Sequence, residues 1–95
     1  MSIRYAVIAD IVGSRDLPDR AQAQRTFTDV LARAGEGLAL LQSPYATVGD
    51  EFQAIADSLG AALTLTLRTQ LLLPGALSLR FGVGAGETRE VGAAD

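Results

Sequence analysis

Residues 45–56 read Tyr-Ala-Thr-Val-Gly-Asp-Glu-Phe-Gln-Ala-Ile-Ala. This pattern predicts a β-hairpin in which residues 45–48 and 51–56 form the strands and Gly49-Asp50 forms a two-residue turn. Glycine suits such a turn because it adopts positive φ at little steric cost. The hairpin lies in the middle of the chain, so the segments on either side of it determine the topology.

Before the hairpin, an apolar run at residues 4–9 predicts a strand that is buried on both faces. A helix is expected to begin near Pro18, a residue that suits the first helical turn. Apolar residues then recur at helical spacing as far as Leu41. Gly35 and Gly37 interrupt this stripe, so the segment is expected to form a kinked helix or two consecutive helices.

After the hairpin, Ser58 is a candidate N-cap for a second helix at residues 59–73, which a Pro-Gly pair stops. A last strand is predicted at residues 77–83. The segment 82–87 is rich in glycine and is interpreted as a turn or as a place of close packing.

The expected order is β-α-β-β-α-β, which predicts one α+β domain over residues 1–95 with the ferredoxin-like split arrangement. Its sheet contains antiparallel strands and its helices lie on one face. Right-handed crossovers make the first two strands parallel and place the third strand antiparallel between them. The end of the first strand then lies beside the hairpin, so Asp10 and Asp50 are expected to converge.

The convergence of Asp10 and Asp50 predicts a metal site. Mg²⁺ in proteins is bound by one or two carboxylates together with waters and substrate phosphates, and Mn²⁺ accepts similar oxygen ligands. The backbone carbonyl of Ile11 is a further candidate ligand. Glu51 is an additional acid nearby, although strand alternation is expected to turn it away from Asp50.

The loop after the first strand is a candidate phosphate site. Its residues Gly13, Ser14 and Arg15 lead into a helix, so backbone amides, the helix dipole and the Arg15 guanidinium could bind phosphate together. A purely structural alternative remains open for both acids. Asp10 could accept hydrogen bonds from the turn amides, and Asp50 could simply suit the hairpin turn.

Composition excludes several classes of function. The chain has neither cysteine nor histidine, which rules out disulfides, thiol nucleophiles and zinc sites built on these residues. The net charge is −3 and all eight basic residues are scattered arginines, so nucleic-acid binding is not expected. No signal peptide or membrane-spanning segment is apparent, so we expect a cytoplasmic protein without membrane contact.

The motifs that carry the two acids resemble a known family. Segments 8–15, 49–53 and 80–84 look like those of the SatD-like family, and the resemblance spans nearly the whole chain. More broadly, segments 9–14 and 48–52 are similar to motifs of the palm superfamily that contains class III nucleotidyl cyclases and diguanylate cyclases.

The cyclase resemblance implies that Asp10 and Asp50 hold metal ions that activate a hydroxyl and steady a purine nucleoside triphosphate, in a homodimer. It also implies that related chains continue further, which would make residue 95 a truncation point. The chain departs from the pattern at Ala46, where class III cyclases usually carry lysine, and at Val48, where diguanylate cyclases carry glycine.

The resemblance therefore favours Mg²⁺-dependent nucleotide binding over complete cyclase catalysis, because the later segments that carry the transition-state donors have no match here. The alternative is a non-catalytic regulatory or interaction module that retains the palm fold, with an apolar partner surface around residues 71–73. A third reading is a fragment of a larger enzyme that is inactive alone.

Overall fold

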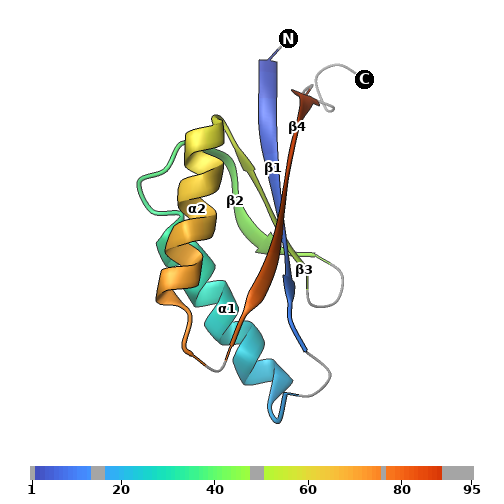
Figure 1. Ribbon diagram of the computed structural model, residues 1–95, viewed down its shortest axis with the longest axis vertical. Helices are drawn as coiled ribbons and strands as arrows, with labels where there is room; N and C mark the ends of the chain where they lie inside the picture. Colours follow the sequence, from blue (N-terminus) through green and yellow to red (C-terminus); the bar gives the residue numbers. More distant parts are fainter. Residues whose placement is uncertain (1, 14–16, 48–50, 76, 89–95) are drawn as a thin grey trace.

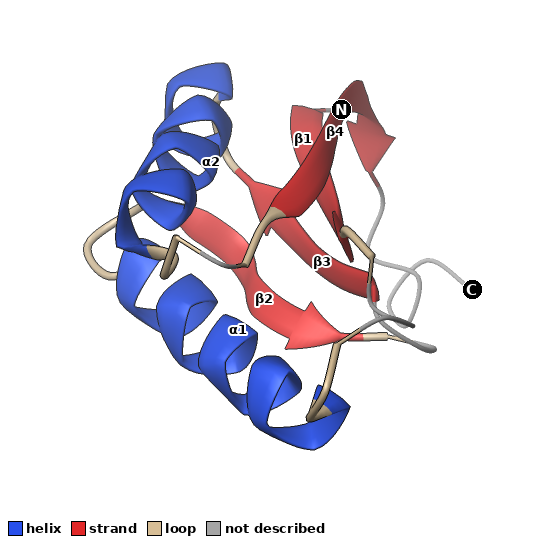
Figure 2. Ribbon diagram, turned by 60° about the horizontal axis from the view of Figure 1, so that its bottom comes forward, coloured by secondary structure: helices blue, strands red, loops and turns tan. Residues whose placement is uncertain are grey.

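The computed structural model describes residues 2–13, 17–47, 51–75 and 77–88. Six elements follow one another along the chain: β1 (Ser2–Ile11), α1 (Arg20–Ala34), β2 (Leu40–Ala46), β3 (Glu51–Ala56), α2 (Leu59–Leu72) and β4 (Leu79–Thr88). The strands form one antiparallel sheet in the order β2-β3-β1-β4. Both helices lie on the same face of this sheet (Figures 1 and 2). The α+β class and the element order are confirmed, and β3 lies between β1 and β2 as expected.

Helix α1 ends earlier than predicted. The helix stops at Ala34, Gly35 is its C-cap, and Gly37 has a φ of 76°. A glycine in the left-handed region commonly redirects the chain after a helix. The chain then enters β2 at Leu40, so the expectation of a kinked helix or two consecutive helices as far as Leu41 is wrong.

Strand β2 is longer than the predicted strand at residues 45–48 and includes Pro44. Its pairing with β3 shifts between Leu40 and Gln42 and again between Gln42 and Tyr45. Proline is tolerated in β2 because the strand lies at the edge of the sheet, where not every N–H is needed by a neighbouring strand.

Strand β4 also extends beyond its prediction and contains the glycine-rich segment. It pairs with β1 along its whole length, from Leu79 opposite Ile11 to Thr88 opposite Ser2. Three glycines follow its alternation, and a Cβ atom built at any of them would meet no heavy atom within 4 Å: Gly82, Gly84 and Gly86. The interpretation of this segment as a turn or close packing is therefore wrong. The segment pairs with the long strand β1 and forms part of the sheet.

Side-chain caps fix the starts of both helices. Asp19 is the N-cap of α1, and its carboxylate accepts a hydrogen bond of 3.0 Å from the Gln22 amide. Pro18 precedes this cap instead of occupying the first turn. Ser58 caps α2 as predicted, accepting a hydrogen bond of 3.1 Å from the Ala61 amide.

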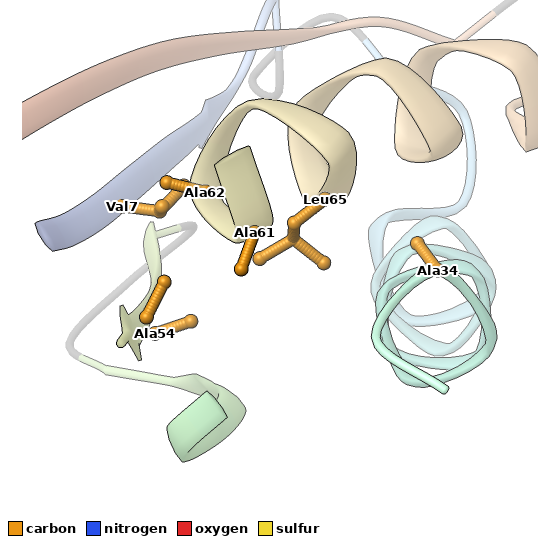
Figure 3. Packing of buried hydrophobic residues seen from close by; sticks show 7 residues of the cluster. Val7, Ala34, Ala54, Ala61, Ala62 and Leu65 are labelled. Atoms are coloured by element: carbon orange, nitrogen blue, oxygen red, sulfur yellow. The ribbon is translucent and has the colours of Figure 1, made fainter. Parts of the chain in front are cut away.

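The core contains two clusters, and the one around Leu65 is built largely from small side chains. Leu65 is fully buried in α2, and it is surrounded by side chains from β1, β3 and both helices (Figure 3): Val7, Ala34, Ala54, Ala61 and Ala62. A second cluster lies nearer the end of β1, where the rings of Phe27 and Phe52 have centroids 6.3 Å apart. Neither described helix has the length and apolarity that crossing a membrane requires.

Candidate functional site

Strand alternation places Asp10 on the face of the sheet that neither helix covers. In β1, Val7, Ala9 and Ile11 are buried in the core on the helix side. Side chains at alternating positions point to opposite faces, so Ile8 and Asp10 project from the other face. We call this second face, visible in Figure 2 as the side without helices, the open face.

The strand register places two charged residues beside Asp10 on the open face. Glu51 in β3 is its direct partner on one side, and Arg80 in β4 is its direct partner on the other. Their neighbours Phe52 and Leu79 are buried, which confirms that Glu51 and Arg80 share the open face with Asp10. We call Arg80, Asp10 and Glu51 the charged row.

Asp10 and Glu51 form a like-charged cross-strand pair. Directly opposed residues have Cβ atoms about 4.5–5.5 Å apart, and like charges in this position destabilise a sheet. Both side chains are half-buried, so water screens the repulsion only in part. A cation between the carboxylates would relieve the repulsion, which makes the pair a suitable donor set for a divalent ion.

Thr47 holds Glu51 in place at the end of the hairpin. The Thr47 amide donates a hydrogen bond of 2.8 Å to the Glu51 carbonyl oxygen. The Thr47 hydroxyl lies 3.3 Å from Glu51 Oε1 and 3.2 Å from the same carbonyl oxygen. The carboxylate therefore has a positioned partner and is not a freely rotating surface group.

The same contact corrects the predicted hairpin turn. A two-residue Gly49-Asp50 turn would place Val48 opposite Glu51, but Thr47 takes that position and Ala46 pairs with Phe52. The connection therefore contains three residues, 48–50, which lie outside the described part of the chain. Asp50 is one of these three residues, so the predicted convergence of Asp50 with Asp10 also lies outside the described part of the chain.

The remaining predicted site residues have mixed outcomes. The Ile11 side chain is 6% exposed and belongs to the core, so only its backbone carbonyl remains a candidate ligand. Gly13 follows β1 in a turn and has a φ of 65°. Ser14 and Arg15 lie outside the described residues.

The start of α1 is less available to phosphate than the sequence suggested. The Asp19 carboxylate already binds the Gln22 amide, and it places a negative charge at the helix N-terminus. An anion at this position would meet electrostatic repulsion. Any phosphate near this end of β1 would have to rely on the turn around Gly13 and on the open face.

The opposite end of the open face has a different composition. Arg4 donates a hydrogen bond of 2.8 Å to Asp57 in an ion pair whose side chains are 25% and 51% exposed. Asp57 is therefore already paired with a cation. Arg4 lies six residues before Asp10, which corresponds to about 20 Å along a strand, so the two acidic positions are separate.

The two carboxylates can be compared with the ligands that Mg²⁺ requires. Within residues 2–13, 17–47, 51–75 and 77–88, no group of three or more Asp, Glu, His or Cys side chains is placed to hold a metal. Asp10 and Glu51 supply two carboxylates, and Mg²⁺ commonly uses one or two together with waters and phosphate oxygens. The described pair would therefore leave coordination positions for a phosphate ligand.

Sequence reasoning did not single out Arg80 or Thr47 as site residues. The alternation of buried Leu79 with exposed Arg80 was a signal that Arg80 lies on the open face. Its position opposite Asp10 depends on the β1–β4 register, which no local pattern specifies.

Comparison with protein-family models gives a match to the SatD family over residues 4–91. This match covers most of the 95 residues, so the chain belongs to the SatD family. A search of curated proteins gives no match.

Proposed function

We propose that this SatD-family chain is a nucleotide-phosphate binding domain of cyclase ancestry that depends on Mg²⁺ or Mn²⁺. The observation that carries the proposal is the cross-strand pair of Asp10 and Glu51 on the open face. The sheet order and the placement of both helices on one face support a ferredoxin-like palm arrangement. Asp50 would join the site from the hairpin connection. We also propose that the protein acts in the cytoplasm.

In this proposal the protein supplies the ligands and their positions. The Asp10 carboxylate is fixed at the end of β1, between two paired strands. Glu51 is oriented by Thr47, and the Ile11 carbonyl at the end of β1 is a further candidate ligand. A bound ion would neutralise the carboxylates and polarise the phosphate oxygens of a purine nucleoside triphosphate. Binding, and not complete cyclisation, is the proposed activity.

Calorimetric titration tests this function. Wild-type protein is titrated with ATP and with GTP in the presence and absence of Mg²⁺, beside Asp10→Ala and a control, Asp29→Ala. Asp29 is an exposed carboxylate on α1, away from the open face. We expect Mg²⁺-dependent binding that Asp10→Ala abolishes and Asp29→Ala preserves. Equal binding without metal, or in the Asp10 variant, would contradict the proposal.

A second candidate function is favoured by the outer side of α2. Five leucines of this helix are 38% to 76% exposed: Leu59, Leu63, Leu67, Leu71 and Leu72. Four of them recur every four residues, so they form a ridge along the helix. A helix that is apolar on its outer side as well as its inner side is usually covered by another element.

A second copy of the chain is the occupant that suits this ridge. The four leucines at spacing four carry no charge, and the same ridge on a second copy would be apolar and complementary in a two-fold arrangement. Arg68, the charged residue of α2, donates hydrogen bonds to the Ala34 and Glu36 carbonyl oxygens and is thereby directed toward the end of α1. The chain would then be a homodimeric interaction module that retains the palm fold.

Sedimentation equilibrium separates the two candidate functions. We expect a wild-type dimer that Leu63→Gln together with Leu67→Gln converts to monomer, whereas Asp10→Ala leaves the dimer intact. A wild-type mass that stays monomeric at every concentration would overturn the interaction module. The nucleotide proposal would then still stand on its own titration.

A further inference from the structure

Arg80 occupies a defined position beside the proposed metal ligands. It is exposed, it lies on the open face, and strand pairing fixes it directly opposite Asp10. Neighbouring strands are about 4.8 Å apart, so the long Arg80 side chain can reach over Asp10 or toward a ligand bound beside it. Within the described part of the chain, the Arg80 side chain makes no ion pair or hydrogen bond.

The other arginines of the sheet face and α2 are already engaged. Arg4 is paired with Asp57, and Arg68 donates to backbone carbonyl oxygens. Among the described residues, the Arg80 guanidinium therefore differs from these two in having no hydrogen-bond or ion-pair partner. Arginine presents these donors in a planar fork that matches two oxygens of a phosphate group.

The charges of the row favour an anion once a metal is present. Asp10 and Glu51 together carry two negative charges, which one divalent ion balances. Arg80 then leaves the row with a net positive charge beside an ion that has free coordination positions. An anionic oxygen ligand that bridges the ion and the guanidinium would occupy a free coordination position and would also neutralise the positive charge. Without a metal the row is net negative and would repel such a ligand.

We propose that Arg80 is a phosphate-binding residue that, together with the ion at Asp10 and Glu51, makes the site specific for polyphosphate–metal complexes. This inference rests on the proposed function, because it assumes a divalent ion at the two carboxylates. It goes further by assigning the anion contact to β4, where the sequence had assigned it to the loop of Gly13, Ser14 and Arg15. The ligand group is the phosphate chain, whether it comes from a nucleoside triphosphate or from inorganic tripolyphosphate.

The test uses Arg80→Gln, Arg80→Lys and a control, Arg25→Gln. Arg25 is an exposed arginine of α1 and takes no part in the charged row. Two titrations are made on each protein: Mn²⁺ alone, and inorganic tripolyphosphate at saturating Mg²⁺. Thermal unfolding shows that each variant is folded, as expected for changes at exposed side chains.

Arg80→Gln should bind Mn²⁺ at least as tightly as the wild type, since a neighbouring positive charge is removed. Its affinity for magnesium tripolyphosphate should fall about ten- to hundred-fold, the range for loss of charged hydrogen bonds. Arg80→Lys should recover part of this loss, because it retains the charge without the fork. Arg25→Gln should match the wild type in both titrations. ATP should show the same order of affinities as tripolyphosphate.

Two results would overturn this role of Arg80. One is tripolyphosphate binding by Arg80→Gln within two-fold of the wild type, with Asp10→Ala still unable to bind. The proposed function would survive that result. The other is a parallel loss of Mn²⁺ binding in Arg80→Gln, which would make Arg80 a support for the carboxylates and not a phosphate ligand. If the wild type binds neither Mn²⁺ nor tripolyphosphate, the proposed function itself fails.

Discussion

Asp10 in β1 and Glu51 in β3 are direct cross-strand neighbours on the face of the sheet that both helices leave uncovered. The β1 positions on either side of Asp10, Ala9 and Ile11, are buried in the core, so Asp10 cannot turn inward without breaking the strand alternation. The fold thus holds two carboxylates together at one end of the sheet. The repulsion between these carboxylates costs free energy, which Arg80 on the other side of Asp10 offsets only in part and which a metal ion bound to both would offset further.

The first consequence concerns stability without metal. Glu51→Gln should raise the free energy of unfolding by about 0.2–1 kcal/mol at low ionic strength, because it removes the cross-strand repulsion. Asp10→Asn should raise it less, because this change also removes the attraction between Asp10 and Arg80 on the opposite side. Glutamine at 51 keeps an oxygen acceptor for Thr47. Urea unfolding in the presence of a chelator measures the change. The double variant should gain less than the sum of the two, and a stability loss in both single variants would contradict the repulsion.

The second prediction concerns the start of α1. Asp19→Ala should lower the free energy of unfolding by about 1 kcal/mol, because the Gln22 amide loses its acceptor. Asp19→Asn should retain most of the stability, since asparagine is an equally good N-cap. Urea unfolding compares the three proteins. Equal stability of the alanine variant and the wild type would show that Asp19 does not cap the helix.

The third prediction concerns which side of α2 faces the sheet. Leu65→Ala should cost about 2–5 kcal/mol, because Leu65 is fully buried beside the alanines of the core. Leu63→Ala, at a position that is 51% exposed, should cost much less in dilute monomeric protein. Thermal and urea unfolding measure both. Similar losses at the two positions would mean that α2 is rotated relative to the arrangement in Figure 3.

The fourth prediction compares two glycines. Gly13→Ala should destabilise the protein by about 1 kcal/mol, because φ is 65° and alanine is strained in the left-handed region. Gly84→Ala lies in extended β4 with open space around a Cβ, so it should be neutral or stabilising by up to about 1 kcal/mol. Unfolding in urea gives both values. The reverse order would contradict the described backbone at these positions.

Much of the fold could be predicted from local patterns. The hairpin composition and the Ser58 cap agreed with the elements that formed. The apolar run at residues 4–9 predicted a strand correctly, but its expected burial on both faces is wrong, because Ile8 is 40% exposed on the open face. The end of α1 could not be placed, because Gly35 and Gly37 are compatible with a kink as well as a stop. The pairing of the next segment, β2, with β3 decides between a kinked helix and a helix that stops. This pairing is a tertiary contact that the local sequence does not specify.

The site was predictable to a smaller extent, because it depends on register. Asp10 was identified from its place after an apolar strand. Its partner Glu51 was expected to point away from Asp50, because strand alternation alone does not reveal that the β1–β3 ladder places Glu51 opposite Asp10. Arg80 is seventy positions away from Asp10 in the sequence, and only the pairing of two ten-residue strands brings them side by side. Long-range register of this kind is not contained in any short motif.

Paramagnetic broadening by Mn²⁺ in an amide NMR spectrum shows directly whether a divalent ion binds between Asp10 and Glu51. At substoichiometric Mn²⁺, we expect broadening that is strongest at amides 9–11, 51–53 and 79–81, next to the charged row. Amides at 3–5 and 56–57, around the Arg4–Asp57 pair, should stay sharp, and Asp10→Ala should remove the broadening. Broadening centred on the Arg4–Asp57 end, or no localised broadening in the wild type, would contradict a metal site at Asp10 and Glu51.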